Sequence, residues 1–271
     1  MTKKDEKKTV EWYKKSAEQG DTDAQFYLGQ CYFHGYGVAK DEKKAVEWYT
    51  KAAEQGNAEA QNSLGWCYQD GEGVKKDEKK AVYWYTLAAE QGNAEAQKNL
   101  GLCHYYGDGV AKNYVKAIEW WTKAAEQGNA DAQNSLGWCY QDGEGVKKDK
   151  EKAVYWYTKA AEQDHARGQN NLGFCYEYGE GVKKDKEKAV YWYTKAAEQG
   201  NVVAQNNLGS FYQYGDGVTK DLEKAVYWYT LAAEQGDAEG QRNLGYCYRH
   251  GIGVLKDREK SAYWYMKSIE Q

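Results

Sequence analysis

Residues 57–92 read NAEAQNSLGWCYQDGEGVKKDEKKAVYWYTLAAEQG, and the Leu64-Gly65 pair within them returns every 36 residues, as from position 28 to position 64. The pair stands at 28–29, 64–65, 100–101, 136–137, 172–173, 208–209 and 244–245. A fixed period of about 20 to 50 residues is the signature of stacked supersecondary units, which share no single globular core. The sequence therefore predicts a repeat protein, and the functional question moves from an active site to an extended surface.

Each repeat is expected to form two helices joined by a tight loop. In residues 57–92 the first helix is predicted at 58–70, behind the N-cap residue Asn57, because its apolar residues follow one helical face. The second helix is predicted at 78–91, behind the N-cap residue Asp77. Gly65 lies inside the first helix, where Gly costs about 1 kcal/mol relative to Ala. We therefore expect the partner helix to approach Gly65 too closely for a Cβ.

The repeats divide the whole chain. Residues 1–20 match a second helix with no first helix before it, and seven tandem repeats follow as one continuous solenoid. The repeats are predicted at 21–56, 57–92, 93–128, 129–164, 165–200, 201–236 and 237–271. Both ends stop at a second helix. We favour the interpretation that the chain is a fragment or domain of a longer array over the alternative that its ends are capped.

Composition and charge exclude several functional classes. The chain has no proline, which permits uninterrupted helices. Its 37 basic and 41 acidic residues are mixed along the sequence without a basic stripe, so we expect no nucleic-acid partner. The start MTKKDEKKTVEWYKK is charged and lacks an apolar segment, so we expect no signal peptide in it, and we expect no membrane insertion because no apolar run is long enough. We expect a cytoplasmic protein if Met1 is the native start.

Six cysteines occupy one position of the repeat, three residues after the leucine, and Phe211 occupies it in the seventh case. Because Phe replaces Cys there, we interpret the position as apolar packing space and expect reduced cysteines in the core. Single cysteines 36 residues apart assemble no four-ligand zinc site. We expect neither a metal nor a cofactor. The cysteines are Cys31, Cys67, Cys103, Cys139, Cys175 and Cys247.

No catalytic residue is predicted, because the sequence offers no nucleophile, base and orienting group in a recognisable set. Cys103 and His104 are adjacent, but neighbouring residues on a helix point about 100° apart. His104 occupies the repeat position of Tyr68, so we interpret it as a substitute in the core. The sequence thus predicts a protein that is not an enzyme.

The chain resembles the Sel-one-like repeat family, a relative of the tetratricopeptide repeat. The matching segments are AEAQNSLGWCYQDGEGV and KAVYWYTLAAEQG, and the resemblance covers essentially the whole chain. It implies an all-α fold, a right-handed α/α superhelical solenoid of helix-turn-helix repeats. It also implies a non-enzymatic scaffold or adaptor. Some secreted relatives credited with β-lactam binding or hydrolysis carry two cysteines per repeat; this chain has one, so their disulfides do not carry over.

Comparison of the repeats separates scaffold positions from a variable face. The positions of Asn62, Trp66, Gln69 and Asp70 vary and share one face of the first helix. By resemblance to tetratricopeptide arrays, this face lines a concave groove, where amides and rings suit a protein or an extended peptide. The predicted binding residues are Phe26, Gln30, His34, Asn62, Trp66, Gln69, Asp70, Lys98, Leu102, Tyr105, Tyr106, Asn134, Trp138, Gln141, Asp142, Asn170, Phe174, Tyr178, Asn206, Gln213, Tyr214, Arg242, Tyr246 and Arg249.

Other functions stay open beside the peptide groove. Aromatic rings and amides in the groove also suit a polysaccharide, and a β-lactam-binding or β-lactam-hydrolysing enzyme is a weaker alternative. We expect a monomer, with end-to-end self-association as an alternative. A second contact surface is a further possibility on the second helices, where a tyrosine position exchanges with glutamate, which indicates exposure. Its tyrosines are Tyr83, Tyr155, Tyr191, Tyr227 and Tyr263.

Overall fold

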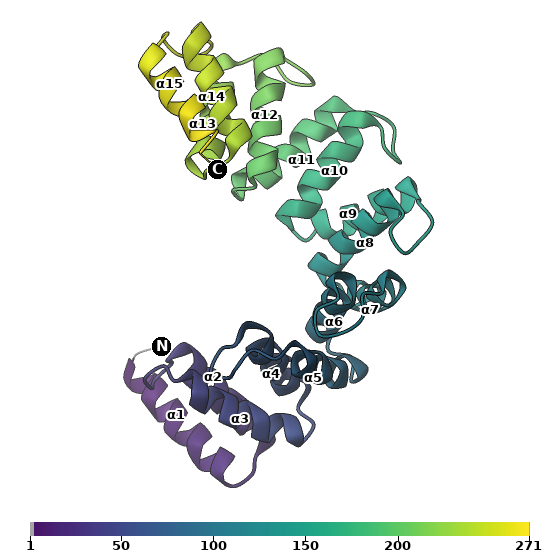
Figure 1. The fold of residues 1–271 in the computed structure, drawn as a ribbon, viewed down its shortest axis with the longest axis vertical. Helices are drawn as coiled ribbons and strands as arrows, with labels where there is room; N and C mark the ends of the chain where they lie inside the picture. The colour runs from purple at the N-terminus through teal and green to yellow at the C-terminus, as the bar shows by residue number, and fades with distance from the viewer. Residues whose placement is uncertain (1–2, 271) are drawn as a thin grey trace. The chain divides into compact units, whose positions relative to one another are not determined.

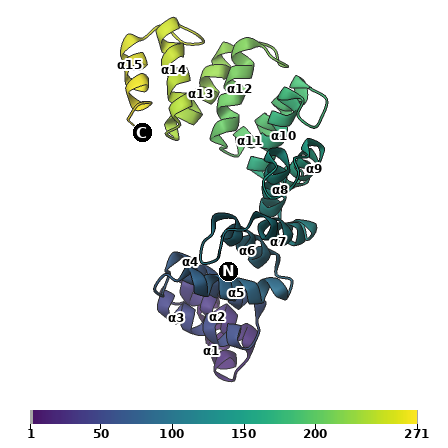
Figure 2. The same ribbon diagram turned by 45° about the vertical axis from the view of Figure 1, so that its right-hand side comes forward.

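The computed structural model describes residues 3–270, and these residues form fifteen helices and no strand. The chain divides into two compact units, Met1–Ala132 and Gln133–Gln271. Within each unit the helices stack side by side in chain order (Figures 1 and 2). In order, the helices are α1 (Lys3–Glu18), α2 (Thr22–His34), α3 (Glu42–Glu54), α4 (Ala58–Asp70), α5 (Glu78–Glu90), α6 (Ala94–Tyr106), α7 (Tyr114–Glu126), α8 (Ala130–Asp142), α9 (Lys150–Ala161), α10 (Ala166–Tyr178), α11 (Lys186–Glu198), α12 (Val202–Tyr214), α13 (Leu222–Glu234), α14 (Ala238–His250) and α15 (Arg258–Lys267).

The helix boundaries follow from short polar and glycine signals in each repeat. The Asn57 side chain accepts a hydrogen bond from the backbone N–H of Ala60 at 2.8 Å, which caps the start of α4. Gly71 ends α4 in the left-handed conformation, at φ 80°, and donates its N–H to the Cys67 carbonyl. Asp77 caps α5 in the same way as Asn57 caps α4. The predicted bounds of α4 are confirmed, and α5 ends one residue before the predicted end.

The two helices of a repeat meet at the repeated glycine. A Cβ on Gly65 would lie 2.7 Å from two carbons of the Tyr85 ring, so α5 packs directly against the α4 backbone there. Leu64 and Tyr85 are both fully buried beside this contact. The predicted close approach at Gly65 is confirmed, and the Tyr85 side chain is the group that fills the space.

Successive repeats are joined through a buried glutamine. Gln61 of α4 donates its side-chain amide to the carbonyl of Ala53, at the end of α3, at 3.0 Å. Its amide oxygen accepts from the Gln91 side chain at 2.7 Å, next to the end of α5. A second junction lies at Gly73, where a Cβ would be 2.3 Å from the Glu42 carbonyl, so the loop rests on the start of the preceding second helix. Each repeat is therefore held to its neighbour by hydrogen bonds of the glutamine and by the contact of its loop with the preceding second helix.

The cysteines and His104 fill core positions. All six cysteines are free and buried, as the exchange with Phe211 predicted. Burial raises the pKa of the Cys67 thiol to about 12, so it stays protonated at neutral pH. His104 is buried in the position that Tyr68 has in its repeat, and burial lowers its pKa. Its interpretation as a core substitute is confirmed.

Candidate functional site

The variable face of the first helices is hollowed in both units. In the first unit a hollow of about 490 Å³ lies over α2, α4 and α6; we call it the first hollow. Trp66 is 37% exposed within it. Its lining residues are Gln30, Phe33, His34, Tyr49, Asn62, Ser63, Trp66, Gln69, Glu95, Lys98 and Asn99.

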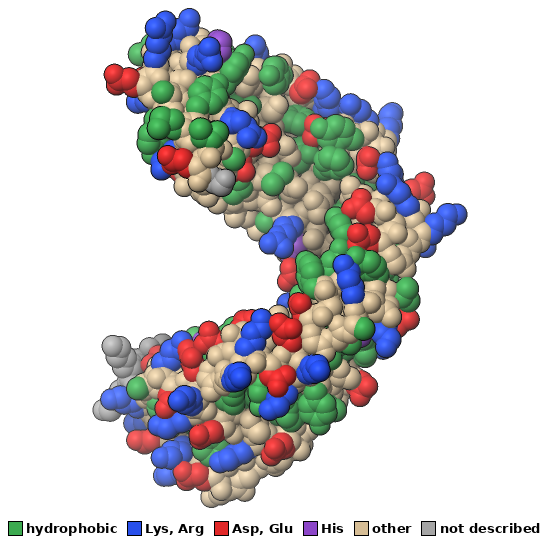
Figure 3. Space-filling model, viewed as in Figure 1, with side chains coloured by type: hydrophobic (Ala, Val, Ile, Leu, Met, Phe, Trp, Pro, Cys, Tyr) green, Lys and Arg blue, Asp and Glu red, His purple; other side chains and the backbone are tan. Residues whose placement is uncertain are grey.

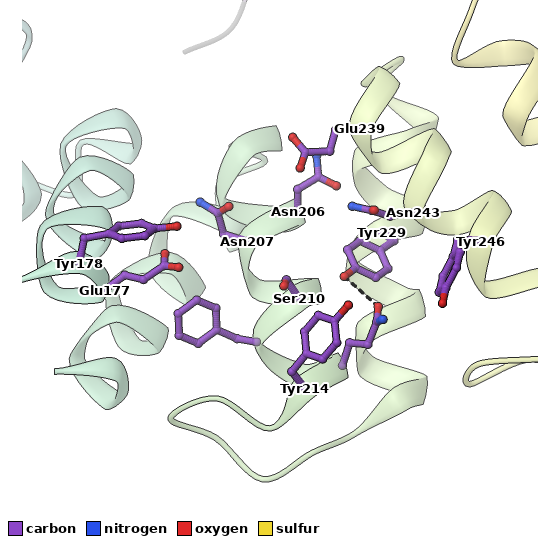
Figure 4. A pocket seen from close by; sticks show the side chains of 12 residues that line it. Glu177, Tyr178, Asn206, Asn207, Ser210, Tyr214, Tyr229, Glu239, Asn243 and Tyr246 are labelled. Atoms are coloured by element: carbon purple, nitrogen blue, oxygen red, sulfur yellow. Dashed lines mark hydrogen bonds between the residues drawn. The ribbon is translucent and has the colours of Figure 1, made fainter. Parts of the chain in front are cut away.

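An equivalent hollow of about 460 Å³ lies over α10, α12 and α14 in the second unit; we call it the second hollow (Figure 4). Three tyrosines stand around it with exposed rings: Tyr178 at 58%, Tyr214 at 68% and Tyr246 at 44%. Its lining residues are Glu177, Tyr178, Asn206, Asn207, Ser210, Phe211, Gln213, Tyr214, Tyr229, Glu239, Asn243 and Tyr246.

The two hollows bring together eleven of the predicted binding residues. They are Gln30, His34, Asn62, Trp66, Gln69 and Lys98 in the first hollow and Tyr178, Asn206, Gln213, Tyr214 and Tyr246 in the second. The other predicted residues line neither hollow; Phe26 instead lines an apolar depression between α1 and α2. Those others are Phe26, Asp70, Leu102, Tyr105, Tyr106, Asn134, Trp138, Gln141, Asp142, Asn170, Phe174, Arg242 and Arg249.

Sequence reasoning missed two repeat positions that line both hollows. One directly precedes the leucine and holds Ser63 and Asn99 in the first unit and Asn207 and Asn243 in the second. The other lies five residues before the leucine and holds Glu95 and Glu239. Both positions vary between repeats in the sequence, so the signal that selected the Asn62 position was present here too. Phe33 and Glu177 were also missed, although they share the repeat position of Gln69.

The asparagine series is partly occupied within the protein. The Asn62 side-chain oxygen accepts from the Asn99 amide at 3.1 Å, and Asn134 accepts from Asn171 at 2.9 Å. These two oxygens already accept a hydrogen bond within the protein, and the binding role of the series stays a prediction. Asn206 is only 5% exposed. The aromatic rings are thus the more accessible part of the predicted face.

Polar groups beneath the hollows tie the helices of a repeat together. The buried Tyr85 hydroxyl donates to the Gln69 side-chain oxygen at 2.8 Å, and Tyr157 and Tyr229 make the same bond to Gln141 and Gln213. In the fourth case Tyr193 donates to the carboxylate of Glu177 at 2.7 Å. Burial, followed by the Glu177 carboxylate, raises the pKa of Tyr193. The repeat position of Gln69 and Glu177 therefore bonds a buried tyrosine and also lines a hollow.

The second helices carry the predicted exposed tyrosines. Tyr83, Tyr155, Tyr191, Tyr227 and Tyr263 are 53–57% exposed. Each lies edge-on to the tryptophan that follows it, as in Tyr227 and Trp228, whose ring centroids are 4.9 Å apart. Their predicted exposure is confirmed, and their role as a second contact surface stays a prediction.

Within residues 3–270, His, Cys, Asp and Glu side chains nowhere gather in a group of three or more that could hold a metal ion. No helix in this described part is long and apolar enough to cross a membrane. Lys and Arg side chains are intermixed with Asp and Glu over the face shown in Figure 3. The two hollows are lined mainly by rings and amides, with a few carboxylates and, in the first hollow, Lys98 and His34.

Comparisons with known proteins identify the repeat. The Sel1 repeat model matches residues 1–21, 22–57, 58–93, 94–129, 130–165, 166–201, 202–237 and 238–271. A protective antigen of uropathogenic Escherichia coli with an SLR fold is 43% identical at a TM-score of 0.85, over 96% of this chain and 56% of that chain. A Sel1 repeat protein from Oxalobacter formigenes is 37% identical at a TM-score of 0.79, over 96% and 75%.

A more remote match shows similarity of fold alone. Yeast Tom70 is 12% identical at a TM-score of 0.53, over 96% of this chain and 54% of that chain. The comparison with curated proteins gave no match. This chain spans little more than half of the Escherichia coli antigen, so the activity of that whole protein does not transfer to it. Family model, close structural relatives and helix-pair architecture agree: the chain belongs to the Sel1 repeat family.

Proposed function

We propose that this protein is a non-enzymatic scaffold that binds a partner protein or an extended peptide through the variable face of its first helices. Sel1 repeats form a scaffold fold that commonly mediates protein–protein interaction. The observation that carries the proposal is that unchanged and variable positions of the first helices lie in different environments. On the first helices, the leucine that repeats unchanged, as at Leu64, is buried, whereas the position that differs between repeats at Trp66 lines a hollow.

The chemistry of the hollows suits a polypeptide segment. Large exposed rings such as Trp66 and Tyr214 bury much area at little entropic cost, which is typical of residues that dominate binding energy. Neighbouring amides, for example Asn207 and Asn243, can bond a peptide backbone. An extended segment lying along the face would use both kinds of group at once.

Selection of peptides on the intact chain tests this proposal. Random peptides of about 12 residues displayed on phage would be selected against the full protein, and their dissociation constants measured by calorimetry. Replacing Trp66, Tyr214 and Tyr246 with Ala removes exposed rings from each hollow, so we expect affinity to fall at least about 30-fold, the scale of a binding hot spot.

The second helices supply a matched control. Tyr83, Tyr191 and Tyr227 are as exposed as the tyrosines of the hollows but lie on the second helices, so their replacement with Ala should leave affinity unchanged. Circular dichroism should show equal helicity for both triple variants. Equal affinities for the two variants would contradict the proposal.

A polysaccharide is the alternative ligand, because exposed rings such as Tyr178 and Tyr214 can also stack on sugars. A glycan array probed with the full chain and with the variant lacking the Trp66, Tyr214 and Tyr246 rings decides between the two. Glycan binding that depends on these rings, without any selected peptide, would replace the peptide proposal.

A further inference from the structure

The two hollows occupy equivalent positions of the repeat but differ in charge. In the first hollow the Glu95 carboxylate is neutralised, because Lys98 of the same helix forms an ion pair with it and the Asn129 amide donates to it at 3.1 Å. In the second hollow the equivalent Glu239 forms no ion pair with any residue that the structure describes. Arg242, one helical turn further along α14, neither pairs with Glu239 nor lines the hollow.

The second hollow also holds a carboxylate that packing does not require. Glu177 accepts the Tyr193 hydroxyl at 2.7 Å, but Gln69, Gln141 and Gln213 make the same bond in other repeats with an uncharged amide. The negative charge is therefore additional to the structural role of this position. None of the twelve residues that line the hollow is Lys or Arg, so no cation in its wall offsets this charge.

A buried oxygen in the wall lacks a donor. The Asn206 side chain is 5% exposed, and its amide group donates to Asp237 at 2.5 Å, while its oxygen has no hydrogen-bond partner among the described residues. Buried polar atoms are bonded in the great majority of cases. The matching oxygen of Asn62 is satisfied by Asn99, so the second hollow differs from the first in its unused acceptor capacity.

Two tyrosine rings line the same hollow as the Glu177 carboxylate. Figure 4 shows Glu177 and Tyr178 reaching into the hollow from α10 and Tyr214 from α12. Figure 4 shows the Tyr178 and Glu177 side chains next to each other. Burial, followed by the charge of Glu177 and a hydrogen bond with it, raises the pKa of Tyr178. A cation over a tyrosine ring gains further attraction from the electron-rich ring face.

We propose that the second hollow takes a basic side chain, Arg or Lys, of the bound segment, with the Glu177 carboxylate as its charge partner and the Tyr178 and Tyr214 rings beside it. This inference rests on the proposed function and adds the chemistry of the partner. Arg suits the site better than Lys, because a planar guanidinium can bond a carboxylate and stack on a ring simultaneously.

The experiment uses peptides selected on the full chain. We expect Arg and Lys to be enriched at one peptide position over the input library. For such a peptide, Glu177→Gln should weaken binding about 10- to 100-fold, the scale of a hydrogen bond to a charged group. Replacing the peptide Arg by citrulline, its uncharged isostere, should weaken binding to the original protein equally and have little further effect on E177Q.

The E177Q variant is expected to fold, because three other repeats carry Gln at this position with the same tyrosine bond. Glu198→Gln on α11 serves as the control, because it removes one exposed carboxylate that lines neither hollow, and it should leave the affinity of the basic peptide unchanged. Selected peptides without basic enrichment, or additive effects of E177Q and citrulline, would overturn the inference while leaving the scaffold proposal standing. Failure to select any peptide would overturn both.

Discussion

The contact between Gly65 and Tyr85 shows how one atom sets the spacing of a helix pair. The position tolerates only hydrogen, because the Tyr85 ring occupies the space of a Cβ. The same geometry recurs at Gly29, Gly137, Gly173 and Gly209 with their tyrosines. The helix-propensity cost of Gly, about 1 kcal/mol, is offset by burial of a whole aromatic ring.

We predict that Gly65→Ala destabilises the protein by about 1–3 kcal/mol, the usual cost of overpacking a core. Gly245 provides a control at the same repeat position, because its nearest neighbours, Ser261 and Tyr265, lie 3.3 Å from the place that a Cβ would occupy. Gly245→Ala should therefore cost clearly less stability than Gly65→Ala. Urea unfolding of both variants checks this, and an equal loss of stability would show that the ring contact is not what selects glycine.

The sequence patterns predicted the presence of the helices and their first and last residues well. The caps Asn57 and Asp77 and the glycine at 71 are local signals, because each acts on backbone groups within a few residues of itself. The buried glutamine of each first helix was not predicted. A polar side chain is expected at the surface in a hydrophobic pattern, and only the meeting of three helix ends shows that Gln61 is buried.

This glutamine should therefore matter more than its polarity suggests. Gln61→Ala removes its bonds to the Ala53 carbonyl and the Gln91 amide, and we predict a loss of about 1–3 kcal/mol, the sum of two hydrogen bonds at about 0.5–1.5 kcal/mol each. Gln91→Ala removes an exposed residue and one of the two bonds, so it should cost less. Urea unfolding measures both, and a neutral Gln61→Ala would show that the glutamine does not join the repeats.

The candidate site was predicted only in part, and the reason is geometric. A position chosen by variation within one helix, such as that of Trp66, is visible in the sequence. Which positions of three successive helices converge depends on how the repeats stack, as with Phe33, Asn62 and Glu95 in the first hollow. The charge of the second hollow likewise depends on which carboxylates find partners, and that follows only from the three-dimensional contacts.

Across the whole molecule, the repeats place buried thiols and tyrosines with raised pKa values at equivalent positions. The cysteine position recurs in both units, and burial raises the thiol pKa to about 12 at Cys67, Cys103, Cys139 and Cys175 and to about 11 at Cys247. The ordinary value is 9.0. Burial also raises the pKa of the packed tyrosines, including Tyr85 and Tyr157, above their ordinary value of 10.0.

These shifts predict a steep loss of stability in alkali. Above pH 9 the unfolded chain releases thiol protons that the folded chain retains, so the contribution of each thiol is complete below pH 9 and is lost progressively up to about pH 12. At about pH 10 the titration of each thiol in the unfolded chain has lowered the free energy of unfolding by about 1.4 kcal/mol relative to its value well below pH 9. Urea unfolding between about pH 8 and pH 10 measures how steeply the free energy of unfolding falls with pH.

Replacing Cys67 and Cys139 with Val keeps the packing apolar, as Phe211 does in its repeat, and should reduce this pH dependence by the share of two thiols. An unchanged slope in this variant would show that the thiols do not carry the pH dependence.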